Sequence, residues 1–315
     1  MKKFLKLFKK VGGKKIVLQY WNAHILNFVI IQILLNGLSK KSLEIVRLAA
    51  NNRNLIKLRK KYKKFITLYK KKENIYFEKK RSNKVWVCWL QGMENAPVIV
   101  KKCYESLQKN LINREIVLIT KKNYKKYVEI PNYIQEKIDK GIITMTHFSD
   151  ILRLEVLSSY GGTWIDATVF CTGNSYPKYI MDSDLFVFQA LKPGLDGHCT
   201  SISSWLMTSC SNNPIILLTK ALLYEYWKKE NKMVDYFLIH DFFQLAIETY
   251  PEEWKKVIPF SNSIPHILLL RLFEEYDENV WNAVKDMTSF HKLSYKFEED
   301  KLALENTYYQ NVINN

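Results

Sequence analysis

The sequence contains few cysteines, and none has the spacing of a zinc site or a disulfide framework. The five cysteines are an odd number and form no CxxC motif: Cys88, Cys103, Cys171, Cys199 and Cys210. Structural zinc sites and disulfide-rich domains need closely spaced or paired cysteines. The sequence therefore argues against a zinc site and indicates a compartment that keeps thiols reduced.

A cleavable secretion signal and a clear membrane span are also missing. The basic run 1–15 is followed by polar residues and no small-residue cleavage site, so we expect the protein to stay in the cytoplasm. The most apolar stretch, Ile16 to Leu38, is interrupted at Gln19, Asn22, Asn27, Gln32 and Asn36. A spanning helix needs about 20 predominantly apolar residues. The stretch therefore predicts a helix that packs on the protein or lies in a membrane interface.

Acidic residues are scarce in the first 80 residues, which hold 22 Lys and Arg against Glu44, Glu73 and Glu78, a net charge of +19. Residues 81–315 hold 26 basic and 28 acidic residues, a net charge of −2. The overall charge of +17 therefore belongs to one segment. This composition divides the chain into a basic amphipathic helical segment, 1–80, and a main domain, 81–315.

A basic amphipathic helix is predicted from Ser42 onward. Its apolar stripe consists of Leu48, Leu55, Leu58, Tyr62, Phe65 and Tyr69. Basic residues flank the stripe at Arg53, Lys57, Lys60, Lys61, Lys63 and Lys64. Such a helix suits an anionic membrane surface, where each nearby Lys or Arg contributes about 1 kcal/mol. Nucleic acid is a less favoured partner because no nucleic-acid motif accompanies the charge. The third alternative is that the stripe packs on the rest of the protein.

The main domain opens with an α/β pattern. Strand, helix and strand are predicted at 84–90, 96–110 and 115–120, which argues for parallel strands with a right-handed crossover and a Rossmann-like sheet. Further strands are predicted at 142–145, 185–189 and 204–208, and helices at 214–230 and 233–249. Ligands gather at the carboxyl ends of parallel strands, which puts Trp89, Gln91 and Gly92 beside a nucleotide site. Because successive side chains of a strand point to opposite faces of the sheet, at least one of Trp86 and Trp89 must be a core residue.

The segment 147–172, which reads HFSDILRLEVLSSYGGTWIDATVFCT, predicts a helix, a glycine stop and a buried strand. Ser149 is the predicted helix cap, and Gly161 and Gly162 end the helix. Asp150 and Arg153 are three apart and share a helix face. The strand, Trp164 to Phe170, contains a single carboxylate, Asp166, which needs a cation or donor beside it.

The pattern Ser-Asp-x-x-Arg followed by Tyr-Gly-Gly-x-Trp-x-Asp-x-Thr resembles the glycosyltransferases with a DXD sugar-binding region. It is most similar to the capsular polysaccharide synthesis branch, which is glycosyltransferase family 32-like. The resemblance implies a GT-A-like catalytic domain in which Asp150 and Arg153 contact the donor sugar. Asp166 would be the carboxylate on the side of a divalent metal, Mn or Mg. Thr168 stands where the wider family has a second Asp.

The same resemblance extends to other residues. Gly161 and Gly162 fall within the substrate-binding motif. His240, in an apolar helix, is either an acceptor-site residue or a satisfied core histidine. Near the C-terminus, His291 resembles a histidine brought to the metal, and Lys292 a basic group at the diphosphate. The turn-rich loop 192–197 has the composition of a substrate flap.

The resemblance implies a nucleotide-sugar donor and a lipid-linked oligosaccharide or polysaccharide acceptor, with retention of the anomeric configuration. Combined with the basic segment 1–80, it predicts an enzyme peripheral on the inner face of the cell membrane. The rival reading is a noncatalytic membrane- or nucleic-acid-binding protein that keeps the motif only for structure. In that reading Asp150 and Arg153 are an ordinary helical ion pair.

Overall fold

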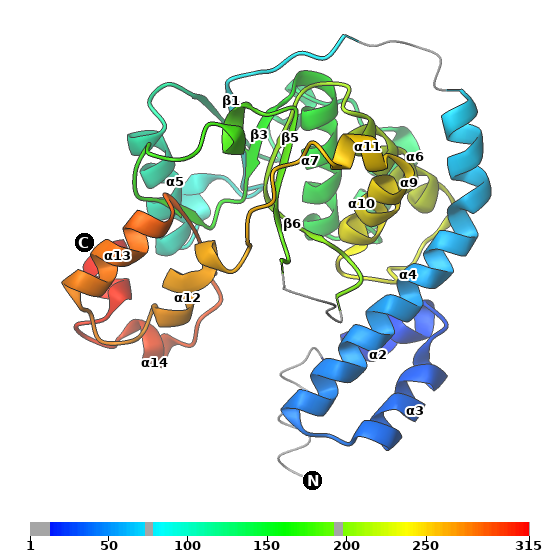
Figure 1. Ribbon diagram of the computed structural model, residues 1–315, viewed down its shortest axis with the longest axis horizontal. Coiled ribbons are helices and arrows are strands. Elements are labelled where there is room, and N and C mark those ends of the chain that lie inside the picture. Colours follow the sequence, from blue (N-terminus) through cyan, green and yellow to red (C-terminus); the bar gives the residue numbers. More distant parts are fainter. Residues whose placement is uncertain (1–12, 73–77, 192–197, 315) are drawn as a thin grey trace.

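A five-stranded sheet lies at the centre of the computed structural model, which describes residues 13–72, 78–191 and 198–314 (Figure 1). Its strands are β1 (Lys84–Cys88), β2 (Glu115–Ile119), β3 (Gly162–Ile165), β5 (Leu185–Gln189) and β6 (Ile202–Ser209). The order is β2-β1-β3-β6-β5; β1 is parallel to β2 and β3, and β6 is antiparallel to β3 and β5. The fold is therefore mixed α/β, and the predicted parallel pairing of the first two strands is confirmed.

Residues of β1 alternate between two hydrophobic cores, one on each side of the sheet. Trp86 belongs to one core, whereas Val85 and Val87 belong to the other. All three are fully buried, as the period of two requires in a strand covered on both faces. Trp86 is thus the core tryptophan, and Trp89 lies beyond the carboxyl end of the strand.

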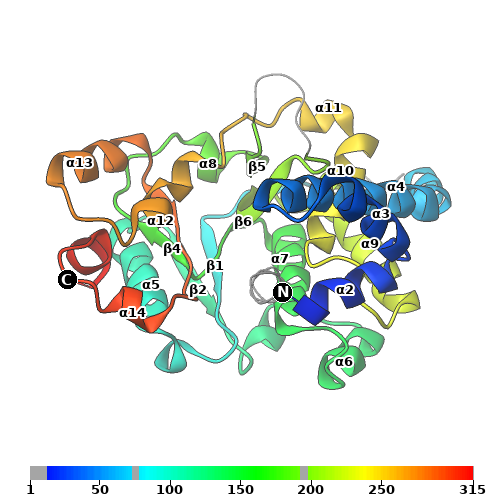
Figure 2. The ribbon, with the colours of Figure 1, turned by 90° about the horizontal axis from the view of Figure 1, so that it is seen from below.

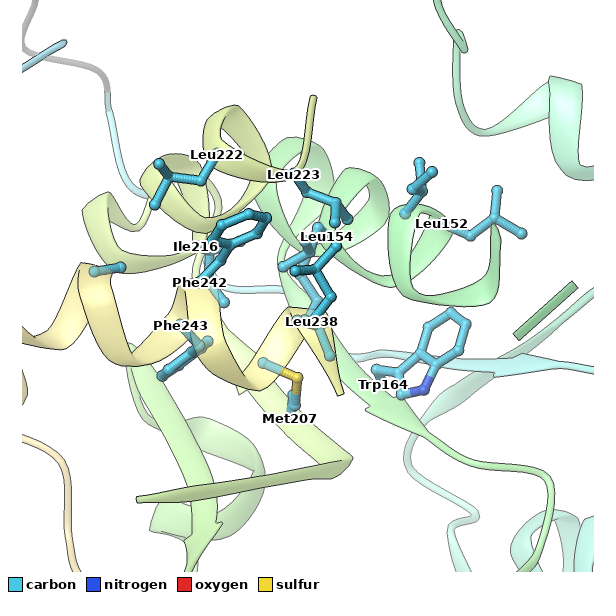
Figure 3. Close-up of a cluster of buried hydrophobic side chains, with 14 of the residues drawn as sticks. Leu152, Leu154, Trp164, Met207, Ile216, Leu222, Leu223, Leu238, Phe242 and Phe243 are labelled. Carbon is cyan, nitrogen blue, oxygen red and sulfur yellow. The ribbon is translucent and has the colours of Figure 1, made fainter. Parts of the chain in front are cut away.

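Four helices cover one face of the sheet: α6 (Asn132–Asp139), α7 (Met145–Tyr160), α9 (Pro214–Lys229) and α10 (Leu238–Thr249). Figure 3 shows leucine and phenylalanine side chains of α7, α9 and α10 meeting Trp164 of β3 and Met207 of β6. A fully buried Leu or Phe side chain contributes about 1.5–3 kcal/mol. This packing fixes the position of α7 over the sheet.

α7 begins earlier than the sequence predicts. Its N-cap is Thr144 rather than Ser149, and the threonine hydroxyl accepts a hydrogen bond from the backbone N–H of His147. The strand predicted at 142–145 does not form, because residues 142–144 make the bend that leads into α7. The five-residue difference moves Asp150 out of the first helical turn.

The glycine pair at the end of α7 has a structural role. Gly161 and Gly162 have φ angles of 69° and 97°, which side chains disfavour. A Cβ atom at Gly162 would lie 2.4 Å from the carbonyl oxygen of Lys84, the first residue of β1. The indole N–H of Trp86 donates to the Gly161 carbonyl at 2.9 Å. The pair therefore lets β3 lie directly against β1, at the amino end of both strands.

The strand predicted from Trp164 to Phe170 is two strands in two sheets. β3 ends at Ile165, and the chain turns at Asp166, whose carbonyl accepts from Val169 N–H at 3.0 Å. β4 (Val169–Cys171) then pairs antiparallel with β7 (Phe290–Lys292), a distant part of the chain. The turn leaves Asp166 at the carboxyl end of β3, where the sequence argument required it.

The other face of the sheet is covered by α5 (Val98–Asn110), α8 (Tyr179–Asp182), α12 (Ile267–Arg271) and α13 (Glu278–Met287) (Figure 1). The remaining short elements are η1 (Met93–Asn95), η2 (Tyr124–Lys126), α11 (Pro251–Trp254), η3 (Ile264–His266), α14 (Glu299–Leu302) and η4 (Tyr309–Asn314). The flap predicted at 192–197 lies outside the described residues.

Among the described residues before the sheet there are three helices: α2 (Gly13–Asn22), α3 (Leu26–Asn36) and α4 (Lys40–Lys71). The predicted stripe of α4 is not free, because Leu55, Leu58 and Tyr62 are buried in the core formed with α9 and α10. The apolar stripe of α4 therefore packs on the rest of the protein, which is the third of the predicted alternatives. Charged side chains of α4 also form ion pairs within the protein. For example, Arg59 donates to Glu248 of α10 at 2.7 Å and 2.8 Å. No helix within 13–72, 78–191 or 198–314 is both long and apolar enough to cross a bilayer.

Candidate functional site

A pocket of about 370 Å³ opens at the carboxyl ends of β1 and β3. Its walls come from the segments after these strands, from the first turns of α7, and from the segment after β7. Seven of the predicted site residues line it: Trp89, Gln91, Asp150, Arg153, Asp166, Thr168 and Lys292. The structure therefore brings together residues from four separate parts of the sequence.

Arg153 lies at the centre of the pocket floor. Its Nη2 atom is 3.2 Å from Asp166 Oδ1 and 3.5 Å from Asp150 Oδ1. The guanidinium also lies over the ring of Trp164, with Cζ 4.9 Å from the ring centroid. Only 5% of the arginine side chain is exposed, so this is a buried ion-pair group. Its position is fixed from three sides.

Two nitrogens of Arg153, Nε and Nη1, are buried and have no hydrogen-bond partner among the described residues. Leaving a buried donor of a charged group unpaired costs more than about 1–3 kcal/mol. Arg153 lines the pocket through its guanidinium edge, while these two buried donors stay unsatisfied. This feature distinguishes Arg153 from an ordinary helical ion pair.

Asp166 meets donors at both of its oxygens. Oδ1 accepts from the indole N–H of Trp164 at 3.0 Å, and Oδ2 lies 3.5 Å from the ammonium of Lys292. Lys292 also donates to the hydroxyl of Thr168 at 2.5 Å. The pairing of β4 with β7 places Lys292 opposite Val169 and so brings the ammonium to the turn after β3. One cationic side chain therefore spans Asp166 and Thr168.

Asp150 is buried beside this network. Burial raises the pKa of its carboxyl from 3.8 to about 7, the nearby Arg153 guanidinium lowers that pKa, and Asp166 raises it. A carboxyl with a pKa in this range can bind a ligand hydroxyl as donor or acceptor, depending on its protonation. The two carboxyls flanking Arg153 are thus in different electrostatic environments.

The pKa of Asp150 predicts a pH dependence of stability. A folded-state pKa above the unfolded value stabilises the protein fully at low pH, and this contribution is lost as pH rises from about 4 to about 7. Asp150→Asn should remove it, so the melting temperature of the variant relative to wild type should increase between pH 4 and pH 8. The buried His240 has the opposite effect on the pH dependence of stability. Burial lowers its pKa to about 4, so its contribution to stability is lost as pH falls. The difference between the two thermal unfolding curves is therefore the measurement, and a difference that does not change with pH would contradict the assignment.

Aromatic residues form the other wall of the pocket. Trp89 is half-buried, and its indole N–H has no partner among the described residues. Its ring meets Tyr295 edge-on, with centroids 5.4 Å apart. Tyr236 and Tyr295 also line the pocket, and 46% and 41% of their surfaces are exposed. Such a wall suits a flat ring such as a nucleotide base.

Tyr236, Tyr295 and Lys296 were not predicted from the sequence. Residues 292–296 all line the pocket, so Tyr295 and Lys296 lie in the same short segment as the predicted Lys292. Their closeness to Lys292 in the sequence was a usable signal. Tyr236 sits in a connection before α10, and its position follows from tertiary packing alone.

Three predicted substrate residues do not line the pocket. Gly92 is buried in the turn after β1, and Gly161 and Gly162 lie at the opposite end of the strands. Glycine patterns accompany close backbone packing as often as ligand contact, and here the packing is observed directly.

The two predicted histidines lie outside the pocket. His240 Nε2 is 2.9 Å from the Ser204 hydroxyl, and its ring stacks on Phe237. Burial lowers the pKa of His240 to about 4, the charge of Arg153 also lowers it, and the charge of Asp166 raises it. His291 is fully buried and packs against Trp281, and its Nε2 is 3.1 Å from the Thr172 hydroxyl.

The side chains present do not fit a resident divalent metal. Within the described residues, no three His, Cys, Asp or Glu side chains come together as metal ligands. His291 points away from the pocket, and Lys292 holds the space between Asp166 and Thr168. A cation would have to displace the ammonium to reach these oxygens. The expected Mn or Mg ion therefore stays a prediction, and no step below depends on it.

The chain is similar to one family over most of its length. The family described as capsular polysaccharide synthesis protein matches residues 32–312. No curated protein matches the chain. Among solved structures, the PaToxG glycosyltransferase is similar at 18% identity and a TM-score of 0.37, over 85% of this chain and 98% of its own. A structure described as a transferase mutant is similar at 11% identity and a TM-score of 0.35, over 57% of this chain and 90% of its own. Neither structural likeness is close enough to assign a residue.

Proposed function

Since the chain belongs to the capsular polysaccharide synthesis protein family, we propose that it is a glycosyltransferase with a GT-A-like domain that uses a nucleotide-sugar donor. The acceptor would be a growing capsular or surface polysaccharide, carried on a lipid at the inner face of the cell membrane. The observation that supports the proposal is Arg153, a buried guanidinium at the pocket that is held between two carboxyls and has two buried, unpaired donors.

The pocket offers three kinds of contact that a nucleotide-sugar needs. The aromatic wall of Trp89 and Tyr295 suits the base. Lys292 and Lys296 supply positive charge for the diphosphate. Asp150, Arg153 and Asp166 supply paired donors and acceptors for the hydroxyls of the sugar. Together these groups support a donor that is bound along its whole length.

In the proposed reaction, the bond between the anomeric carbon and the diphosphate oxygen breaks, and an acceptor hydroxyl oxygen bonds to that carbon. The acceptor proton leaves to solvent or to a pocket base, and the nucleoside diphosphate leaves with the electron pair. Lys292 would stabilise the negative charge that develops on the leaving oxygen. Arg153 and Asp166 would hold the sugar so that its reacting carbon faces the acceptor. Retention of configuration is part of the proposal and is tested by the anomer formed.

A panel of nucleotide-sugars tests the proposal directly. The correct donor should raise the melting temperature, since ligand at about 100 times its dissociation constant adds roughly 2.7 kcal/mol. The same donor should be slowly hydrolysed and, with acceptor present, transferred. A protein that is stabilised by none of the donors would contradict the proposal.

Lys292→Met should lower transfer by about 100- to 1,000-fold, because a donor aimed at developing charge contributes on the order of 2.7–4 kcal/mol to the transition state. The wild-type rate should change little when divalent ions are removed by EDTA, since Lys292 already holds the position beside Asp166. Transfer assays with and without EDTA measure both effects. Lys140→Met, at an exposed lysine outside the pocket, is the matched control. Loss of wild-type transfer in EDTA with full recovery by Mn²⁺ would instead establish the metal.

A further inference from the structure

α3 has apolar residues on both of its sides. One side packs on α4 and α2, with Val29 buried and Ile33 partly buried. The other side faces outward and exposes Ile30 (46%), Ile31 (54%), Leu34 (78%), Leu35 (76%) and Leu38 (47%). The first four positions are spaced by one, three and four residues, so they form one continuous stripe along the helix, and Leu38 follows in the connection to α4. We call this stripe the α3 outer face.

Nothing in the fold of the described chain covers the α3 outer face. Scattered exposed leucines are normal in proteins, but a contiguous row of four large aliphatic side chains on one helix marks an interaction surface. α2 adds Leu18 and Trp21, which are 59% and 62% exposed and lie three apart on their helix. An interfacial tryptophan is typical of helices that lie in a membrane headgroup region.

Positive charge surrounds the α3 outer face. α3 itself contains no charged residue. Lys14 and Lys15 on α2, with Lys40 and Lys41 at the start of α4, are exposed and form no ion pair with another described residue. An apolar stripe between unpaired lysines matches the chemistry of an anionic lipid bilayer, whose headgroups neutralise the lysines while the acyl region receives the aliphatic side chains.

The hairpin of α2 and α3 lies on the same side of the molecule as the pocket mouth. In Figure 1, α2 and α3 extend below the sheet, toward the end where β1 finishes, and Figure 2 views the molecule from that side. A direct contact connects the two regions, because Asn22 donates to the Met233 carbonyl at 3.2 Å. Val234 packs in the hairpin core, and Tyr236, two residues later, lines the pocket.

We propose that the α2–α3 hairpin inserts the α3 outer face into the interface of an anionic membrane, with the flanking lysines on the lipid headgroups. The partner is the bilayer itself, and the contact surface is α3 rather than the buried stripe of α4. The pocket mouth then faces the membrane plane. In this orientation the pocket is presented to a lipid-linked acceptor, a consequence that rests on the proposed glycosyl transfer.

Vesicle binding of matched variants tests the proposal. The full chain should bind vesicles of phosphatidylglycerol and phosphatidylcholine and should release in high salt. The double variant Leu34→Glu with Leu35→Glu should lose binding by about tenfold or more, because charge on the inserted face opposes burial in the bilayer. Ile112→Glu changes an equally exposed aliphatic residue, 72% exposed at the end of α5, and should bind as wild type. Lys40→Glu with Lys41→Glu should weaken binding to anionic vesicles only.

Each other outcome overturns the proposal. Equal loss in the α3 variant and in Ile112→Glu would show that binding is not located on α3. A dimer in analytical ultracentrifugation that dissociates in the α3 variant would identify a second copy of this chain as the occupant. Donor binding without vesicles, measured by thermal stabilisation, separates this surface from the active site. The α3 variant should keep donor binding in full, whereas failure of the proposed function would remove donor binding in wild type as well.

Discussion

Arg153→Lys should lower sugar transfer by about 100- to 1,000-fold while leaving the affinity for the free nucleoside diphosphate almost unchanged. The guanidinium spans Asp150 and Asp166 and has two buried, unpaired donors. A lysine can keep the charge between the carboxylates, but it cannot provide parallel hydrogen bonds in a fixed plane. Initial rates at saturating donor, together with calorimetric binding of the diphosphate, measure the two quantities separately.

The free diphosphate is the internal control in this experiment, because it lacks the sugar. Arg59→Lys is the matched variant, since Arg59 also makes a two-point contact with a carboxylate but lies on α4, away from the pocket. It should leave transfer unchanged. If Arg153→Lys weakens diphosphate binding and transfer to the same extent, Arg153 contacts the phosphates. If transfer is unaltered, the residue has only a structural role.

Asp166→Asn should reduce transfer by about 100-fold or more, with little change in the fold. Asparagine is nearly isosteric, and its carbonyl oxygen can still accept the indole N–H of Trp164. The negative charge between Arg153 and Lys292 is lost, however, so both cations are free to shift toward the diphosphate. We expect diphosphate binding to be kept or strengthened while sugar-dependent steps fail. Circular dichroism, diphosphate affinity and transfer rate check these three expectations.

Asp182→Asn provides the comparison for Asp166→Asn. Asp182 pairs with Arg114 at 2.8 Å on the surface, outside the pocket, and a surface pair contributes at most about 1 kcal/mol. Its loss should not alter transfer. Full activity in Asp166→Asn, with the variant correctly folded, would remove Asp166 from the site.

The hydrophobic period of the sequence predicted most of the fold. The strand at 185–189 and the helix from 214 match β5 and α9 almost residue for residue, because each buries a continuous apolar surface. Asp150, Arg153 and Asp166 were also correctly grouped, since they lie in one short segment around a single crossing of the sheet. Local sequence patterns are sufficient for prediction where the contacting residues lie close together in the sequence.

Contacts between distant segments were less predictable. Whether His291 or Lys292 faces the pocket depends on the register of β7 against β4, and a three-residue strand gives too short a pattern to fix it. The place where β3 ends was also hidden, because Ala167 and Thr168 are as compatible with a strand as with the observed turn. For α4, composition predicted an amphipathic helix. Only tertiary packing decides whether the apolar residues of α4 or those of α3 stay uncovered.

The pairing of β4 with β7 also sets the order in which the pocket can form during synthesis. Thr168 and Lys292 are separated by 124 residues, and their contact closes one side of the pocket. A nascent chain that ends before residue 292 can contain β1, β2, β3 and α7 but not β7. Such a chain holds Asp150, Arg153 and Asp166 but lacks the ammonium of Lys292. A complete pocket therefore needs nearly the whole polypeptide, and chains that end before residue 292 lack one of its walls.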